Sequence, residues 1–109
     1  MTLPTKIDVG PLQITVSESQ ADFQRMVVED ATDTWGYARY GECLIVLKPA
    51  QAESHKRMVL LHELMHFLWH AGDRLHKEDE TAISVLAAPL LDTLRRNPAL
   101  VAYLMEAAA

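Results

Sequence analysis

One segment restricts the possible folds of this chain more than any other. It is the apolar run from Met58 to Trp69, which contains the sequence His-Glu-Leu-Met-His at residues 62–66. A run of this kind is typical of a largely buried helix. Two histidines four residues apart lie on one face of a helix, one turn apart, and can bind one zinc ion. Glu63 is poorly placed as a ligand but well placed to polarise a metal-bound water, so the motif predicts a small zinc-dependent hydrolase, in particular a peptidase.

At about 100° per residue, this helix has an apolar face and a narrow polar stripe. The residues expected to face inward are Leu61, Leu64, Met65 and Leu68. The polar stripe consists of His62, Glu63, His66 and His70, with Val59 beside it and Leu60, Phe67 and Trp69 at its flanks. The competing interpretation is that these histidines are ordinary polar residues on a helix surface. A surface stripe does not need three histidines and a glutamate among so many apolar neighbours, so the metal site is favoured.

The composition is that of one small domain without an internal disulfide. The chain has 109 residues, half of them apolar, which is enough for one compact core. Its formal net charge of −5 argues against nucleic-acid binding as the main function. Cys43 is the only cysteine, and we see neither a signal sequence nor an apolar run long enough to span a membrane. These features predict a cytoplasmic protein with no membrane partner.

The N-terminal part of the chain predicts one strand followed by one short helix. Residues 1–10 are expected to be a lead-in with turn residues. Apolar and polar side chains alternate over residues 12–16, which is typical of a half-buried strand. Ser17 or Ser19 is then in position to cap a helix over about 18–29. The alternative is a second strand, because the Met-Val-Val near the end of this segment is also compatible with one.

A hairpin and a long helix are predicted next. Residues 35–40 and 43–48 are rich in aromatic and β-branched side chains and flank a turn containing glycine. Residues 44–47 are uniformly apolar, so this strand is expected to be central or covered on both faces. The helix that carries the motif is expected over about 50–71, with Gly72 as its C-terminal stop.

The C-terminal part predicts two more helices. After a loop over 73–77, a helix is expected over about 78–96, with a kink or a break at Pro89. Asn97 is expected to cap the last helix, over about 98–107. The apolar positions expected to face the core from the first of these helices are Ile83, Leu86, Ala87, Leu90 and Leu94.

A catalytic zinc needs three protein ligands and one open position, so a third ligand must follow the two histidines. The downstream residues able to bind a metal are His70, His76, Glu78, Asp79 and Glu80. With Ile83 at the centre of its helix's apolar face, Asp79 lies about 40° to one side and Glu80 about 60° to the other. Either acid can therefore face the motif helix, whereas Glu78 points away. His70, one turn beyond His66, is a further alternative.

The longer pattern H-E-x-x-H-x-x-G-x-x-H is not met, because Trp69 replaces its glycine and Gly72 its third histidine. Residues 60–66, followed by Glu80 and a Leu-Ala and a Leu-Leu pair spaced behind it, instead resemble the ImmA/IrrE-like metallopeptidases. The likeness covers about residues 35–105 and is greatest to short single-domain members from phages and prophages. It implies an α+β, minimal zincin-like fold in one domain over residues 1–109. A small, mainly antiparallel sheet would pack on the active-site helix, with two further C-terminal helices.

The resemblance also implies roles for particular residues. Zinc would be held by His62, His66 and Glu80, with Glu63 as the general base. Better-known members act on transcriptional repressors, so a protein or peptide substrate of that type is expected. This chain departs from the family at one position. The family usually has an alanine three residues after the ligand glutamate, but Ile83 is found three residues after Glu80. Ala82 instead lies three residues after Asp79, so the register of the third ligand is open by one residue.

Two other classes of protein are compatible with the sequence. The first is a zinc-binding module of the same fold that cleaves nothing and acts by binding a partner. The second is a helical interaction protein without a metal. A metal analysis separates the second class from the others, and only a turnover measurement separates the first.

Overall fold

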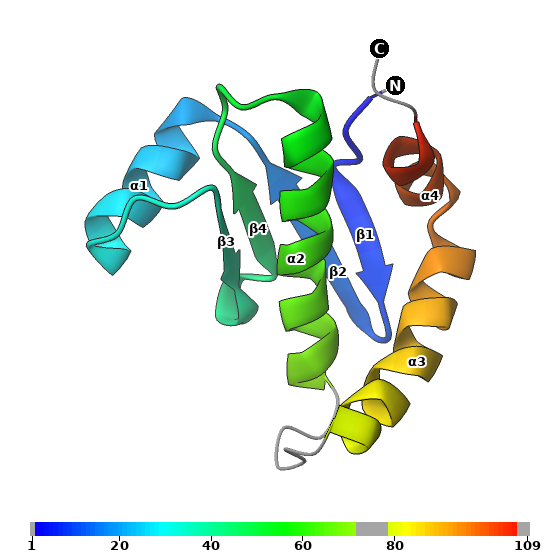
Figure 1. The fold of residues 1–109 in the computed structure, drawn as a ribbon. Coiled ribbons are helices and arrows are strands. Elements are labelled where there is room, and N and C mark those ends of the chain that lie inside the picture. Colours follow the sequence, from blue (N-terminus) through cyan, green and yellow to red (C-terminus); the bar gives the residue numbers. More distant parts are fainter. Residues whose placement is uncertain (1, 72–78, 107–109) are drawn as a thin grey trace.

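A four-stranded sheet forms the central layer, and helices pack on both of its faces (Figure 1). The computed structural model describes residues 2–71 and 79–106, except for the side chains of residues 70, 71, 79–85 and 87. The strands are β1 (Lys6–Val9), β2 (Leu12–Ser17), β3 (Gly36–Arg39) and β4 (Leu44–Leu47). Their order is β1-β2-β4-β3, with β2 and β4 parallel and the other two pairs antiparallel. The predicted α+β fold with a small, mainly antiparallel sheet is confirmed.

The helices match the predicted number and order within the described residues. They are α1 (Gln20–Asp30), α2 (Glu53–Ala71), α3 (Asp79–Arg96) and α4 (Pro98–Met105), and a short 3-10 turn, Tyr40–Glu42, joins β3 to β4. Figure 1 shows α2 lying across the sheet, α1 near the β3–β4 side, and α3 and α4 along the β1 side. Over the described ranges, none of the helices has both the length and the apolar character needed to cross a membrane.

The hairpin of β3 and β4 confirms the prediction for this part of the chain. The two strands pair in antiparallel register, with Gly36 opposite Leu47. β4 lies between β2 and β3, and its side chains alternate between two clusters. Ile45 packs with α2, whereas Val46 packs on the other face with residues of α1. The apolar strand is thus central and covered on both faces, as its composition predicts.

Helix α1 is the predicted first helix, and the strand alternative is wrong. Ser19 is its N-cap, with the Ser19 hydroxyl oxygen accepting a hydrogen bond from the Asp22 backbone N–H at 3.1 Å. Phe23 and Met26 are buried and pack with Tyr37 of β3. These contacts require helical spacing between the two α1 residues.

The inward face of α2 differs from the predicted face. The residues buried in the core are Leu60, Leu64, Phe67 and Leu68. Met65, predicted to face inward, is 41% exposed, and Leu61 is only half-buried. Apolar side chains occupy nearly all positions around this helix, so their spacing does not define one inward direction. The helix is rotated relative to the prediction, so that Glu63 is buried while His62 and His66 stay exposed.

β1 and the role of Asn97 were not predicted from the sequence. Residues 1–10 were expected to be a lead-in, but Lys6–Val9 form a strand whose two apolar side chains are buried. Asn97 occupies the predicted N-cap position of α4, yet its side chain makes no capping hydrogen bond. Instead, its Oδ1 accepts from the Asp8 backbone N–H and its Nδ2 donates to the Asp8 carbonyl, both at 2.9 Å. Asn97 therefore joins β1 to the junction between α3 and α4.

Helix α3 continues through Pro89, so of the predicted kink or break the break is wrong. Proline has no N–H to donate, and the Pro89 carbonyl accepts a hydrogen bond from the Thr93 hydroxyl at 2.7 Å. The predicted core residues of α3 that are described pack against the core, namely Leu86, Leu90 and Leu94. The predicted stop at Gly72 and the loop over 73–77 lie outside the described residues.

Polar side chains anchor the first turns of α2 to α4 and to the end of β2. Lys56, only 8% exposed, forms ion pairs with Glu53 at 2.7 Å and with Glu18 at 2.9 Å. Tyr103 of α4 is fully buried and donates its hydroxyl to the Glu53 carboxylate at 2.9 Å. Burial, followed by the hydrogen bond to Glu53, raises the pKa of Tyr103 to about 12. Tyr103 thus has a structural role, joining α4 to the first turn of α2.

This anchor predicts a loss of stability at alkaline pH. Because the folded-state pKa of Tyr103 lies above the value near 10 of an exposed tyrosine, the folded state holds the proton more tightly. This tighter proton binding contributes about 2–3 kcal/mol to the free energy of unfolding. The contribution is complete below pH 10 and is lost as the pH rises towards 12. Urea unfolding at pH 8, 10 and 11 measures it. Tyr103→Phe should be less stable than wild type at pH 8 but should lack this loss of stability at high pH. If the free energy of unfolding fell equally with pH in both proteins, the assignment to Tyr103 would be contradicted.

Candidate metal centre

Helix α2 brings the two motif histidines and Glu63 together within a small volume. One ligand atom from each of His62, Glu63 and His66 lies within 4.8 Å of the others. The Nε2 atoms of the two histidines are 3.2 Å apart. Two nitrogen ligands of one tetrahedral zinc ion, at the usual Zn–N distance, lie about 3.3 Å apart. The observed separation of the two nitrogens is close to this value, so the rings could bind one zinc ion without moving. The same separation also suits a hydrogen bond between the two rings.

The Glu63 carboxylate is buried between the helix and the sheet. It is 6% exposed, whereas both histidines are exposed. Its Oε2 has no hydrogen-bond partner among the described residues. Burial raises the pKa of the Glu63 carboxyl, and the neighbouring His66 and His62 act in the opposite direction. A buried carboxylate oxygen without a protein partner is typical of a group that serves water, an ion or a reactant, so this donor set fits a zinc centre.

Gly36, the first residue of β3, belongs to the site although it was not predicted from the sequence. A Cβ at this position would lie 2.7 Å from Cγ1 of Val59 and 3.2 Å from Cγ of Glu63. The shorter distance is well inside van der Waals contact, so only glycine allows β3 to lie this close to α2. A glycine at the start of a strand can mark a close approach of another segment to the backbone. This was the one sequence signal that could have identified Gly36 as part of the site.

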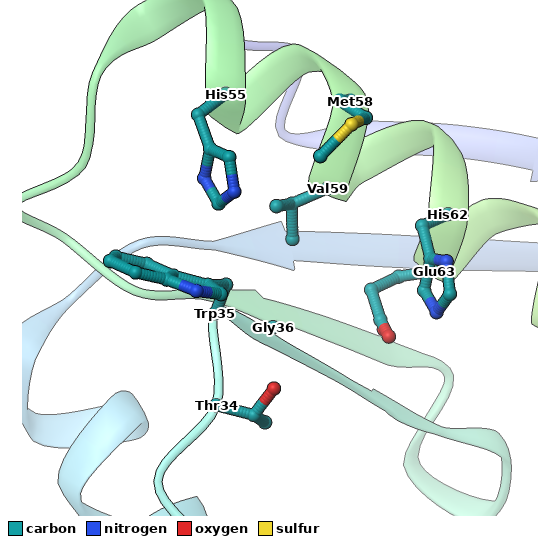
Figure 2. A pocket seen from close by; sticks show the side chains of 8 residues that line it. All are labelled: Thr34, Trp35, Gly36, His55, Met58, Val59, His62 and Glu63. Carbon is teal, nitrogen blue, oxygen red and sulfur yellow. The ribbon is translucent and has the colours of Figure 1, made fainter.

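A pocket of about 240 Å³ opens beside Glu63, between α2 and the segment leading into β3 (Figure 2). Its lining residues are Thr34, Trp35, Gly36, His55, Met58, Val59, His62 and Glu63. One end of the pocket is the candidate metal centre. The other end is formed by Trp35 and by His55, which lies about two helical turns before His62. Of the residues lining this pocket, only His62 and Glu63 were predicted from the sequence to belong to a site.

A second pocket, of about 300 Å³, lies between the histidines and α3. It is lined by His62, Met65, His66, Trp69 and Leu86. α3 therefore borders the histidines, as a third ligand from this helix requires. The side chains of Glu80, Asp79 and His70, and residues 72–78 with Glu78 and His76, lie outside the described residues. The assignment of Glu80 as the third ligand stays a prediction.

These features together are those of a metallopeptidase-type domain: a histidine–glutamate–histidine helix on a small mixed sheet, with an edge strand beside the glutamate. Comparison with protein families agrees, because the family described as the IrrE N-terminal-like domain, Peptidase M78, matches residues 16–90. The chain belongs to this family, whose members are typically metal-dependent. The match begins and ends earlier than the range 35–105 expected from the resemblance, and it includes the whole motif and Glu80. Neither a curated protein nor a solved structure matches the chain.

Proposed function

We propose that this domain is a zinc-dependent peptidase in which His62, His66 and Glu80 hold the ion and Glu63 is the general base. The observation that carries the proposal is the position of the Glu63 carboxylate. It is buried beside both histidines, one of its oxygens lacks a partner among the described residues, and it lies on the wall of an open pocket. Membership of a peptidase family supports the same function.

The chemistry assigned to the protein side chains is proton transfer. When bound, zinc supplies a Lewis acid that acidifies a water molecule and polarises the scissile carbonyl. Glu63 takes one proton from the attacking water and delivers it to the leaving amine, so one water is consumed as the C–N bond breaks. In the metal-free protein, burial raises the pKa of this carboxyl.

The proposed substrate is an extended segment of a protein or peptide. β3 is an edge strand of the sheet and packs against α2. Within the described part of the chain, no strand pairs with its outer edge. An added peptide strand would pair with this edge and pass Gly36, where β3 lies against Glu63. The family resemblance suggests a repressor-type regulator as the first protein to test. The net charge of −5 argues against nucleic acid as the main partner.

Protein purified without a metal-affinity tag should contain close to one zinc per chain. Elemental analysis measures this, because a built zinc site retains its ion through purification. Less than about a tenth of an equivalent, without uptake of added zinc, would remove the metal site from the proposal. Chelation should stop cleavage of an unfolded casein-like protein, and one equivalent of zinc should restore it. Cleavage that persists in metal-free protein would contradict the proposed chemistry.

A further inference from the structure

The end of the first pocket away from the metal centre contains an exposed tryptophan that is held in place from two sides. The Trp35 side chain is 47% exposed although its ring packs edge-on against His55, with ring centroids 4.8 Å apart. The ammonium group of Lys48 lies 4.7 Å from the centroid of the same ring. The indole is therefore ordered by these contacts and still offers apolar surface to the pocket.

A hydrogen-bond network fixes the orientation of Gln51, which contacts His55. Nε2 of Gln51 donates to the Trp35 carbonyl at 3.2 Å and to the Lys48 carbonyl at 2.9 Å. The amide oxygen of Gln51 is therefore the atom that lies 2.6 Å from Nδ1 of His55. Because an amide oxygen only accepts, Nδ1 of His55 must carry a hydrogen.

This network leaves the other ring nitrogen of neutral His55 as a hydrogen-bond acceptor. No described residue is a hydrogen-bond partner of His55 Nε2. In Figure 2 one nitrogen of the ring is turned away from the pocket and the other towards Val59 and His62. The seven residues from His55 to His62 correspond to about 10 Å along α2. The acceptor thus lies at the far end of the pocket, within reach of a long side chain placed beside the metal centre.

Resting on the proposed peptidase function, we infer that this end of the pocket is a subsite that selects a tyrosine side chain of the substrate. The walls formed by Trp35, Met58 and Val59 suit an aromatic ring. The tyrosine hydroxyl donates to Nε2 of His55, whereas phenylalanine leaves this acceptor unpaired.

The cleavage specificity of the zinc-loaded protein tests this subsite. Sites in an unfolded casein-like protein, mapped by mass spectrometry, should fall beside tyrosine more often than beside phenylalanine. For a matched pair of peptides, the tyrosine peptide should have the higher kcat/KM by about 3- to 10-fold, as expected for one neutral hydrogen bond at a partly open site. His55→Phe retains an aromatic ring against Trp35 and should bring this ratio to about one. Thr34→Val removes another pocket hydroxyl and should leave the ratio unchanged.

A binding measurement separates failure of the subsite from failure of the proposed function. Metal-free wild-type protein is titrated with N-acetylated alanine hexapeptides containing one tyrosine or one phenylalanine, and the His55 ring proton between the two nitrogens is followed by NMR. A larger shift and tighter binding with the tyrosine peptide support the subsite, even where no peptide is cleaved. Equal binding of the two peptides overturns it. A tyrosine preference that Thr34→Val removes and His55→Phe retains also overturns it.

Discussion

Replacing Glu63 with glutamine should reduce peptide hydrolysis by on the order of 10²–10⁴-fold while leaving the fold and the zinc content intact. Glutamine has nearly the same volume, so it fits the tight contact with Gly36, but it cannot take a proton from water. Glu63 is one residue, about 100°, from His62 around the helix, so the substitution leaves both histidines in place. Turnover of a casein-like protein and of a repressor-type regulator, elemental analysis and circular dichroism measure the three parts of this result.

A matched control makes the same chemical change far from the pocket. Glu42 lies in the 3-10 turn, where its carboxylate pairs with Arg25 at 2.7 Å, so Glu42→Gln should retain full turnover. Equal loss in both variants would point to a general effect of charge. Equal binding of a regulator by wild type and Glu63→Gln, with zinc present and no cleavage by either, would favour a catalytically inactive, partner-binding module of the same fold.

Substitution of Glu80 with glutamine should weaken zinc binding by more than roughly 100-fold. Loss of a group that only hydrogen-bonds to a metal ligand typically weakens binding by roughly 10–100-fold, and loss of a ligand should cost more. The reason is that a neutral amide is a much poorer zinc ligand than a carboxylate, and two histidines alone leave the ion under-coordinated. The family resemblance implies Glu80 as the ligand, and α3, which contains it, borders both histidines. Competition with a chromophoric chelator measures the change in affinity.

Asp79→Asn and Glu78→Gln are the controls for this assignment. Asp79 is the closer competitor, since it lies seven residues, about two turns, before Leu86, and Leu86 borders the same pocket as the histidines. If Asp79→Asn empties the site and Glu80→Gln does not, the ligand register is off by one residue. If His70→Ala empties it, the third ligand belongs to the motif helix itself.

Local periodicity explains why the motif and most elements could be identified from the sequence. His62 and His66 are brought together by any helix that contains them, whatever the rest of the chain does. The alternation over residues 12–16 and the glycine-containing turn between two apolar segments are equally local. The family resemblance rests on the same residues, which is why the fold class and the family were both predicted correctly.

Features that depend on contacts between distant segments were not predictable in this way. The inward side of α2 is chosen by the sheet, because the helix has apolar residues nearly all round. β1 was missed because its four residues are held by β2 and by Asn97, which lies 89 residues from Asp8. The far end of the pocket was missed for the same reason: Trp35 and His55 meet only when the segment before β3 packs on α2.

The close contact at Gly36 limits how this domain can be redesigned. Trp35, His55 and Met58 line an open pocket, so libraries at these positions should alter substrate preference with little change to the backbone. Position 36 does not tolerate such variation, because even alanine would push Val59 and Glu63 away from the strand. The spacing between the edge strand and Glu63 is thereby fixed by glycine, the one residue type without a side chain. New specificity must be introduced around that glycine rather than at it.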